Sequence, residues 1–268
     1  MPRPLGQHFL RDPAILDRIV DALDPRPDDI VLEIGPGEGT LTRRLAPRVG
    51  RVVAIEKDRR LVEKLGGAGS GERYPPLPRN VTVLEGDALD LDWHRSTQLT
   101  AHSALKVIGN IPYQITSPLI EKALDPPVPA VIVFLVQKEV ADRVTAAPGS
   151  KAYGALSVGV QSVARAERLF TVKAGAFSPP PKVDSAVLRL TPLAGPLVGE
   201  AERAPFRAFV VGLFGQRRKQ LGRSLRDVAS LDREAAARMI EGAGIDAGAR
   251  VEAVAPPGLV RLFHTIPR

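Results

Sequence analysis

The chain has 268 residues, of which 44% are hydrophobic, enough for one large domain or one domain with a small appendage. Lysine and arginine exceed aspartate and glutamate by 37 to 30, which favours an anionic partner, nucleic acid ahead of membrane. The absence of cysteine excludes disulfides, thiolate metal sites and a cysteine nucleophile, and no apolar run approaches the roughly 20 residues of a membrane span.

Apolar runs rich in β-branched residues alternate with helical patterns through the first half of the chain. Strands are expected at 29–35, 51–58, 80–89, 105–112 and 130–137. Their near-continuous hydrophobicity is typical of strands that are covered on both faces. Helices are expected between them, for example at 40–49 and 59–66. This alternation predicts a parallel α/β sheet.

The second half of the chain changes character. Late strands are expected at 155–163 and 185–191, the second of them as an antiparallel edge strand. A Pro- and Gly-rich segment at 191–205 then marks a domain boundary, and the residues beyond it read as helices. We therefore expect one domain over 1–195 and a helical domain over 196–268.

A glycine-rich loop, LEIGPGEGTLT, joins the first strand to the first helix. Gly35, Gly37 and Gly39 allow the backbone to approach a ligand closely at the helix N-terminus. Thr40 stands where the dinucleotide fingerprint has its last glycine, so the spacing is G-x-G-x-G, the form seen in methyltransferases that use S-adenosylmethionine. The alternative is a tight strand-to-helix turn without a ligand.

Acidic residues end the next two expected strands. Glu56, about 20 residues beyond the first glycine, suits hydrogen bonding to ribose hydroxyls, and Asp87 suits an adenine amino group. Either one alone could be a solvated strand end. Because ligands of open α/β sheets bind at the carboxyl ends of the strands, we expect both beside the glycine loop.

Residues 109–113 read GNIPY and directly follow the fourth expected strand. Proline cannot donate a backbone hydrogen bond and pushes the residue before it toward extended geometry, so a stiff loop presents Asn110 and Tyr113. Taken alone, the segment is equally compatible with a turn that carries a capping asparagine.

The lack of cysteine narrows the chemistry, because methylation of a pyrimidine carbon normally needs that nucleophile whereas methylation of an exocyclic amine does not. The side-chain oxygen of Asn110 and the carbonyl of Ile111 can accept hydrogen bonds from such an amine, with Pro112 holding them in place. Tyr113 offers an aromatic face to a base that has left its stack. We predict that these four residues position a base amine for methyl transfer.

Seven stretches together carry a resemblance: GQHFL (6–10), EIGPGEGTLT (33–42), GNIPYQITSPLI (109–120), LVQKEVADRV (135–144), SKAYGALSV (150–158), FSPPPKVDSAVLRL (177–190) and FGQRRKQLGRSL (214–225). With these, the chain resembles the ribosomal RNA adenine dimethyltransferase family. The resemblance implies a Rossmann-like class I methyltransferase sheet with a small all-α C-terminal domain. It also implies S-adenosylmethionine as donor and, in the housekeeping bacterial branch, two adjacent adenosines in the 3′-terminal hairpin loop of small-subunit (16S) rRNA as target.

The resemblance also assigns residues. His8 and Leu10 stand where the family's N-terminal segment closes over the donor, and Asn110 joins the donor-binding set of Gly35, Gly37, Glu56 and Asp87. Tyr113 matches the aromatic residue that stacks on the target adenine, and Phe177 a second aromatic residue at the pocket mouth. His8 departs from the more usual Asn, Gln114 from Asn and Ile111 from Leu.

Two other functions remain open. NIPY also occurs in the erythromycin-resistance methylases, which dimethylate an adenosine of large-subunit rRNA, although three motifs are closer to the housekeeping form. The other alternative is a non-catalytic RNA-binding assembly or transcription factor on the same fold.

The C-terminal helices carry a basic cluster that we expect to contact RNA phosphates: Arg207, Arg217, Arg218, Lys219, Arg223 and Arg226. By their spacing of four and three, residues 219, 223 and 226 are expected on one helix face. The alternative is a solvated basic face. The four histidines have no metal-like spacing. We expect a cytoplasmic monomer without a metal, acting on small-subunit rRNA or a pre-30S ribosomal particle in ribosome biogenesis.

Overall fold

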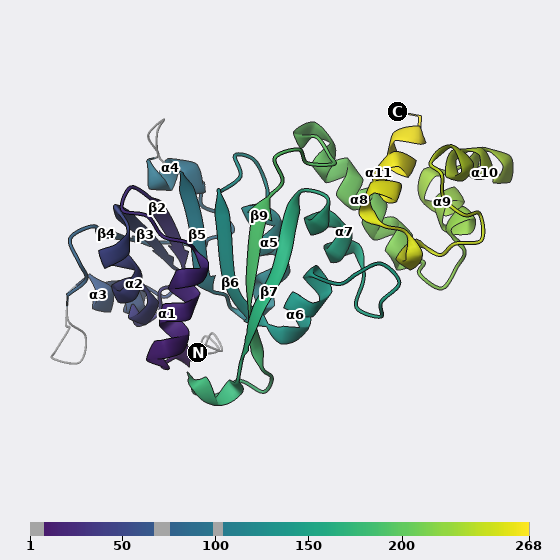
Figure 1. Cartoon of the computed structure of the whole chain (residues 1–268). Helices are drawn as coiled ribbons and strands as arrows, with labels where there is room; N and C mark the ends of the chain where they lie inside the picture. The colour runs from purple at the N-terminus through teal and green to yellow at the C-terminus, as the bar shows by residue number, and fades with distance from the viewer. Residues whose placement is uncertain (1–7, 67–75, 99–103, 268) are drawn as a thin grey trace. The chain divides into compact units, whose positions relative to one another are not determined.

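A computed structural model describes residues 8–66, 76–98 and 104–267 of the chain (Figure 1). The chain divides into two compact units, each of which is considered by itself. The first comprises residues 1–141 and 167–191, and the second comprises residues 142–166 and 192–268.

The first unit is built on a seven-stranded sheet with the order β4-β3-β2-β5-β6-β9-β7. Its strands are β2 (Ile30–Ile34), β3 (Arg51–Glu56), β4 (Val81–Glu85), β5 (Leu105–Asn110), β6 (Val131–Gln137), β7 (Ala164–Val172) and β9 (Ser185–Pro192). The pairings from β4 through β6 are parallel, and β9 is antiparallel to β6. The five strands expected in the first half of the chain are thus confirmed, and the central ones are buried on both faces, as their composition predicted.

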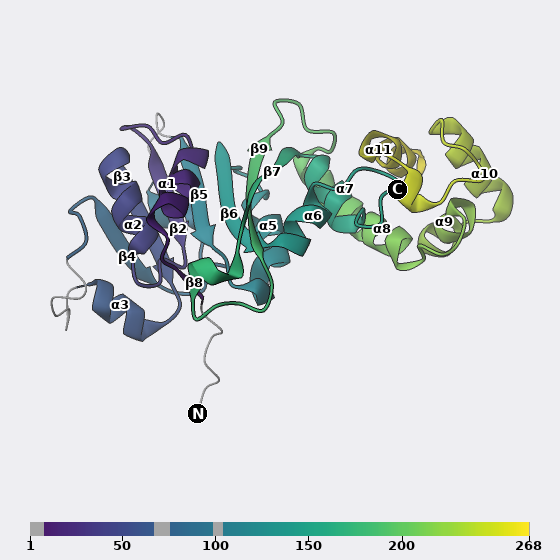
Figure 2. The same ribbon diagram turned by 60° about the horizontal axis from the view of Figure 1, so that its bottom comes forward.

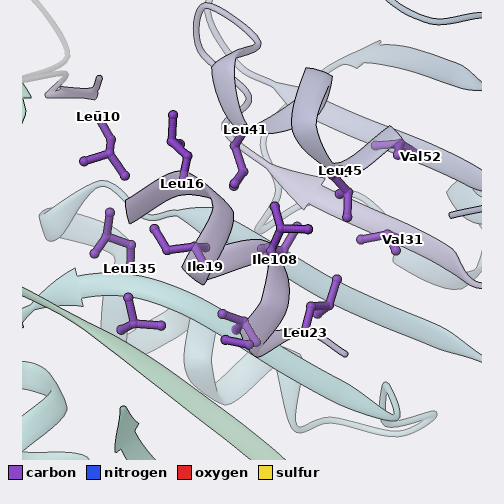
Figure 3. Close-up of a cluster of buried hydrophobic side chains, with 14 of the residues drawn as sticks. Leu10, Leu16, Ile19, Leu23, Val31, Leu41, Leu45, Val52, Ile108 and Leu135 are labelled. Atoms are coloured by element: carbon purple, nitrogen blue, oxygen red, sulfur yellow. The ribbon is translucent and has the colours of Figure 1, made fainter. Parts of the chain in front are cut away.

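Helices cover this sheet. They are α1 (Pro13–Ala22), α2 (Thr40–Leu45), α3 (Arg59–Leu65), α4 (Trp93–Thr97), α5 (Thr116–Ala123) and α6 (Lys138–Val144), with 3₁₀ turns η1 (Ala46–Arg48), η2 (Tyr113–Ile115) and η3 (Ala174–Ala176). Leu16 and Ile19 of α1 and Leu41 of α2 pack with Val31 and Ile108 of the sheet (Figure 3). Burying each such side chain contributes about 1.5–3 kcal/mol, so this cluster fixes the helices on the sheet.

A separate two-stranded ribbon is formed by β1 (Phe9–Leu10) and β8 (Phe177–Ser178). The strands are antiparallel, with Phe9 opposite Ser178 and Leu10 opposite Phe177. Leu10 and Phe177 belong to the same buried cluster as α1 and α2, and the turned view shows β8 on that side of the sheet (Figure 2). The ribbon therefore holds the start of the described chain against the core.

Two predictions for the second half of the chain are wrong. Residues 155–163 form not a strand but helix α7 (Ala155–Gln161), because Ser157 accepts a hydrogen bond from the N–H of Gly154 (3.0 Å) and caps the helix. Strand β9 is antiparallel but lies inside the sheet, and the edge is β7. Charged residues such as Arg165 and Arg168 interrupt β7, as edge strands commonly require, and this concealed it from a search for apolar runs.

The second unit is helical. It contains α7, α8 (Arg203–Gly215), α9 (Leu221–Ala229), α10 (Arg233–Gly242) and α11 (Pro256–Thr265), with 3₁₀ turns η4 (Glu200–Glu202) and η5 (Val251–Ala253). Phe206, Leu213 and Leu259 lie in its core, where Tyr153 donates a hydrogen bond to the carbonyl of Val254 (2.9 Å). Residues 142–166 pack with these helices, although the predicted boundary grouped them with the sheet. Within the described ranges, no helix has the length and apolar character needed to cross a membrane.

Candidate active site

The carboxyl ends of β2 and β5 meet at the centre of the sheet. Ile34 pairs with Gly109, and the strand order reverses between these two strands, which is where ligands bind in open α/β sheets. A Cβ atom at Gly109 would lie 2.5 Å from the carbonyl oxygen of Ile34, so only glycine permits this close pairing. The glycine loop and the GNIPY loop therefore begin as neighbours.

The glycine loop adopts the strained backbone that its composition predicts. Gly35, Gly37 and Gly39 have φ angles of +66°, +59° and +75°, in the left-handed region that disfavours side chains. A Cβ atom at Gly37 would also lie 2.9 Å from Cε1 of Phe9. The loop forms a tight strand-to-helix turn and also lines a cavity, so its predicted role in donor binding remains a prediction.

Glu56, at the end of β3, is 4% exposed and fixes the glycine loop. One carboxylate oxygen accepts a hydrogen bond from the N–H of Gly37 (3.1 Å) and the other from the N–H of Asp58 (2.9 Å). Each oxygen has a second lone pair, so the side chain keeps acceptor capacity for a ligand hydroxyl.

Glu33 is a buried residue of the cavity lining that was not predicted from the sequence. It lies within the apolar strand β2, is 1% exposed and lines the cavity, and its Oε2 atom has no hydrogen-bond partner among the described residues. Burial raises the pKa of Glu33 to about 7. Thr42 and Arg43 oppose this rise in pKa, and Glu56 adds to it. The sequence did carry a sign of this residue, because Glu33 is the one carboxylate in the otherwise apolar run IVLEI.

Asp87, just beyond β4, does not line the cavity. Its Oδ2 atom pairs with Nζ of Lys57 at 2.6 Å, and its Oδ1 atom accepts a hydrogen bond from the N–H of Leu89 (2.9 Å). The hydrogen bond from Lys57 holds the pKa of Asp87 below its usual value, so this side chain is a carboxylate at neutral pH. Its predicted role toward an adenine amino group remains a prediction.

The GNIPY loop turns sharply at the end of β5. Nδ2 of Asn110 donates a hydrogen bond to the carbonyl of His8 (2.9 Å), which leaves its Oδ1 atom as an acceptor. The N–H of Ile111 donates to the carbonyl of Leu135 (3.0 Å), and the Ile111 side chain is buried. Pro112 then leads into η2, which begins at Tyr113. Main-chain and side-chain bonds thus fix the loop on both sides of the proline.

Tyr113 is held at both its hydroxyl and its ring. The hydroxyl lies 3.0 Å from Oγ of Ser185, and the ring centroid lies 5.9 Å from that of His8, with 33° between the ring planes. Nδ1 of His8 lies 2.8 Å from the carbonyl oxygen of Pro179.

One cavity of about 90 Å³ brings most of the predicted site together. Of the predicted residues, its lining includes His8, Leu10, Gly35, Gly37, Glu56, Asn110, Ile111, Pro112 and Tyr113. Phe177 is not brought there: its side chain is 5% exposed and packs in the core cluster, because its strand β8 faces inward opposite Leu10. The expected second aromatic residue at the pocket mouth is therefore not presented by Phe177.

The predicted RNA-contacting residues all lie in the second unit. Arg207 is on α8 and Arg223 and Arg226 are on α9, but α8 ends at Gly215 and α9 begins at Leu221. Lys219 is therefore in the connecting turn, and the helix face expected from residues 219, 223 and 226 is not continuous.

The basic residues of this turn differ in their partners. Arg217 donates hydrogen bonds to the carbonyls of Lys151 (3.1 Å) and Ser150 (3.2 Å). Lys219 pairs with Asp227 at 3.0 Å. Arg218 and the two arginines of α9 are exposed, and no hydrogen bond or ion pair joins their side chains to another described residue. Across the described ranges, no group of three or more His, Asp or Glu residues is arranged to hold a metal ion.

The chain matches a family of known proteins and individual members that bear names. Residues 2–267 match the family described as Ribosomal RNA adenine dimethylase. A protein of Acidithiobacillus ferrooxidans named Ribosomal RNA small subunit methyltransferase A is 40% identical over 258 residues, which cover 96% of this chain and 91% of that protein. The protein of the same name from Xanthomonas campestris pv. campestris is 40% identical over 263 residues, 98% of this chain and 95% of that one.

Two solved structures are similar over the same span. The crystal structure of the 23S rRNA methyltransferase ErmE has 31% sequence identity and a TM-score of 0.71, covering 96% of this chain and 99% of its own. A dimethyladenosine transferase from Plasmodium falciparum has 26% identity and a TM-score of 0.77, covering 95% of this chain and 96% of its own.

Proposed function

The chain belongs to the ribosomal RNA adenine dimethylase family, and from this premise we propose that it uses S-adenosylmethionine to dimethylate N6 of two adjacent adenosines in the 3′-terminal hairpin loop of small-subunit rRNA. The observation that carries the proposal is the cavity at the ends of β2 and β5, where the glycine loop, two buried carboxylates and the Asn-Ile-Pro-Tyr loop converge.

The cavity residues fit this donor. Side chains at Gly35 and Gly37 would fill the loop or strain it, so the glycines keep space for a ligand. Glu56 has acceptor capacity for ribose hydroxyls, and the unpartnered Oε2 atom of Glu33 suits a cationic group such as the donor's ammonium. Leu10 and Asn110, which also line the cavity, complete the proposed donor-binding set, together with Asp87, which lies outside the lining. The bound donor supplies an electrophilic methyl group on a sulfonium.

The chain's own part in the reaction is to hold the target amine. Because Nδ2 of Asn110 is engaged with the His8 carbonyl, its Oδ1 atom is left to accept from an amine hydrogen, together with the carbonyl of Ile111. Both acceptors favour the nucleophilic geometry of the amine in the transition state, and Pro112 fixes their spacing. When the new N–C bond forms and the S–C bond breaks, the amine carries one extra proton, which leaves to water.

Tyr113 is proposed to stack on the extruded adenine. Its hydroxyl contact with Ser185 keeps the ring from turning, so the aromatic face is preorganised. Extruding a base costs a few kcal/mol, and stacking on an aromatic ring returns about 1–3 kcal/mol of it.

The choice of small-subunit rRNA rests on relatedness. The two small-subunit enzymes are 40% identical to this chain, against 31% for ErmE, a 23S rRNA methyltransferase. The large-subunit substrate therefore remains the second candidate. We propose further that the exposed arginines of the second unit contact RNA phosphates, and that the protein acts as a monomer in the cytoplasm on a pre-30S particle.

The test is methyl transfer to defined substrates. Labelled donor is offered with small subunits that lack the modification and, separately, with naked large-subunit rRNA, and the products are mapped by mass spectrometry. We expect dimethyladenosine at two adjacent positions of the small-subunit rRNA. Label only in large-subunit rRNA would favour the resistance-type activity, and RNA binding without label would favour a non-catalytic factor.

A further inference from the structure

The ring beside Tyr113 in the cavity is that of His8. The second aromatic residue expected at this place, Phe177, is buried in the core, whereas the imidazole of His8 lies 5.9 Å from the Tyr113 ring, centroid to centroid. Both His8 and Tyr113 line the cavity. Phe9 lines the cavity as well, but its ring lies next to Gly37. His8 and Tyr113, from segments that lie far apart in the sequence, are the two rings that come together there.

We propose that His8 is the second aromatic wall of the target-base site, so that the adenine is held between the imidazole and the phenol ring. This inference rests on the proposed function. It assigns to His8 a contact with the RNA base, whereas the resemblance places this position over the methyl donor.

The His8 ring is anchored through both its side chain and its backbone. A carbonyl oxygen only accepts hydrogen bonds, so Nδ1 of His8 carries the proton that points to Pro179, 2.8 Å away. The backbone carbonyl of His8 accepts the hydrogen bond from Asn110 (2.9 Å). His8 thus connects the stacking surface to the side chain that is proposed to hold the amine.

The spacing of the two rings defines what the base does on entry. A flat base between two rings needs about 7 Å, two contact layers of about 3.5 Å each. The observed centroid distance of 5.9 Å is too small for that, and the 33° angle between the ring planes is larger than a sandwiched base requires. When adenine enters, the rings therefore separate by about 1 Å and turn toward a parallel arrangement. His8 directly precedes strand β1, which has only two residues. We therefore expect the His8 ring, rather than the Tyr113 ring, to move when the base enters.

The experiment compares His8→Phe with His8→Leu. Both variants lose the hydrogen bond to Pro179, and only the first keeps an aromatic ring, so their difference isolates stacking. We measure kcat and KM on small-subunit RNA with saturating donor, donor affinity by calorimetry without RNA, and the melting temperature of each variant. Stacking worth about 1–3 kcal/mol corresponds to an expected 5- to 150-fold loss of kcat/KM for His8→Leu.

The expected pattern has two further parts. His8→Phe stays closer to the wild-type kcat/KM than His8→Leu does, and donor affinity is equal in the two variants. Because contacting residues are energetically coupled, the double variant with Tyr113→Leu should lose less than the product of the two single losses.

Three results would overturn the inference. They are equal kcat/KM for His8→Leu and wild type, equal losses for His8→Phe and His8→Leu, or a loss of donor affinity in His8→Leu that accounts for its loss of kcat/KM. A wild-type protein that labels no adenosine in either ribosomal RNA would instead defeat the proposed function, so the two failures are distinguishable.

Discussion

The proposed active site, at the carboxyl ends of β2, β3 and β5, and the basic turn of the second unit (residues 216–220) differ in how their polar side chains are held. In the proposed active site, Glu56 and Asn110 are each fixed by hydrogen bonds to the backbone and keep acceptor capacity for a ligand. In the basic turn, Arg217 and Lys219 are engaged with partners in their own unit, while Arg218 is exposed.

This difference predicts how strongly a single substitution should affect function in each region. Preorganised acceptors in a buried site act on one substrate group, so removing one of them is costly. Exposed cations act on phosphates through a screened field, and each contributes a small, similar share. We therefore expect a large effect from each single substitution in the proposed active site, and small effects that add up from the basic residues of the second unit.

Asn110→Ala should produce the largest effect. Loss of one preorganised acceptor is expected to lower kcat by about 10²- to 10³-fold, while RNA affinity stays within about twofold. Methyl transfer and filter binding with the same RNA check this. The matched control is Asn80→Ala, which removes hydrogen bonds to the carbonyls of Ala46 (2.8 Å) and Val49 (3.0 Å) and should lower stability but not kcat. Equal kcat in wild type and Asn110→Ala would contradict the proposed mechanism.

Glu33→Gln should change stability in a pH-dependent way. The folded pKa of about 7 exceeds the ordinary value of 4.5, so the folded state binds the proton more tightly and wild-type stability falls as pH rises from 4.5 to 7. The loss approaches about 3 kcal/mol above pH 7. Glutamine does not titrate, so the variant should gain relative stability over this window.

Urea unfolding at pH 5 and pH 8 measures the effect of Glu33→Gln. The control is Glu85→Gln at the exposed end of β4, which makes the same substitution on the surface of the same sheet. A difference between wild type and Glu33→Gln that is the same at both pH values would show that Glu33 is not protonated in the folded state.

The sequence was most informative where local pattern and packing agree. The strands before Gly35 and Asn110 are continuous apolar runs, and their buried pairing followed from that pattern. Residues 155–163 misled because a short apolar stretch fits a strand or a helix, and the Gly154–Ser157 cap decides between them. Edge strand β7 carries too many charges to read as apolar.

Within the site, the motif residues were predictable and their partners were not. Asn110 and Tyr113 follow from the chemistry of amide and phenol groups next to proline. The contact of Tyr113 with His8 and the inward turn of Phe177 depend on how β1 pairs with β8, a tertiary contact between distant segments. The carbonyls that accept hydrogen bonds from Arg217 likewise belong to residues about 66 positions away, which no local charge pattern reveals.

Gly37→Ala tests whether the proposed active site depends on the backbone conformation of the glycine loop. A side chain at φ +59° costs about 1–2 kcal/mol, and its Cβ atom would also approach Phe9 to 2.9 Å. We expect a lower melting temperature and weaker donor binding. Gly175→Ala is the matched control, because a Cβ atom there meets nothing within 4 Å, and it should behave as wild type. Equal melting temperatures for wild type and Gly37→Ala would mean that the loop rearranges readily.

The smallest effects per residue are expected in the basic turn and in α9, where arginines with and without partners in their own unit can be compared. Removing the side chains of Arg218, Arg223 and Arg226 should flatten the dependence of log affinity on log salt by about 0.7–0.9 for each phosphate that is no longer neutralised. Arg217→Ala should instead lower the free energy of unfolding, because it loses two hydrogen bonds to backbone carbonyls.

RNA binding at several salt concentrations, together with urea unfolding, checks both arms. Arg59→Ala controls for net charge, since Arg59 is an exposed arginine of α3 that already pairs with Glu63 at 3.0 Å. If Arg217→Ala flattened the salt dependence as much as Arg218→Ala, then an arginine that is hydrogen-bonded within its own unit would still contact RNA phosphates. The contrast between fixed and available charges would then fail, and all the basic residues of the turn would have to be treated as one field.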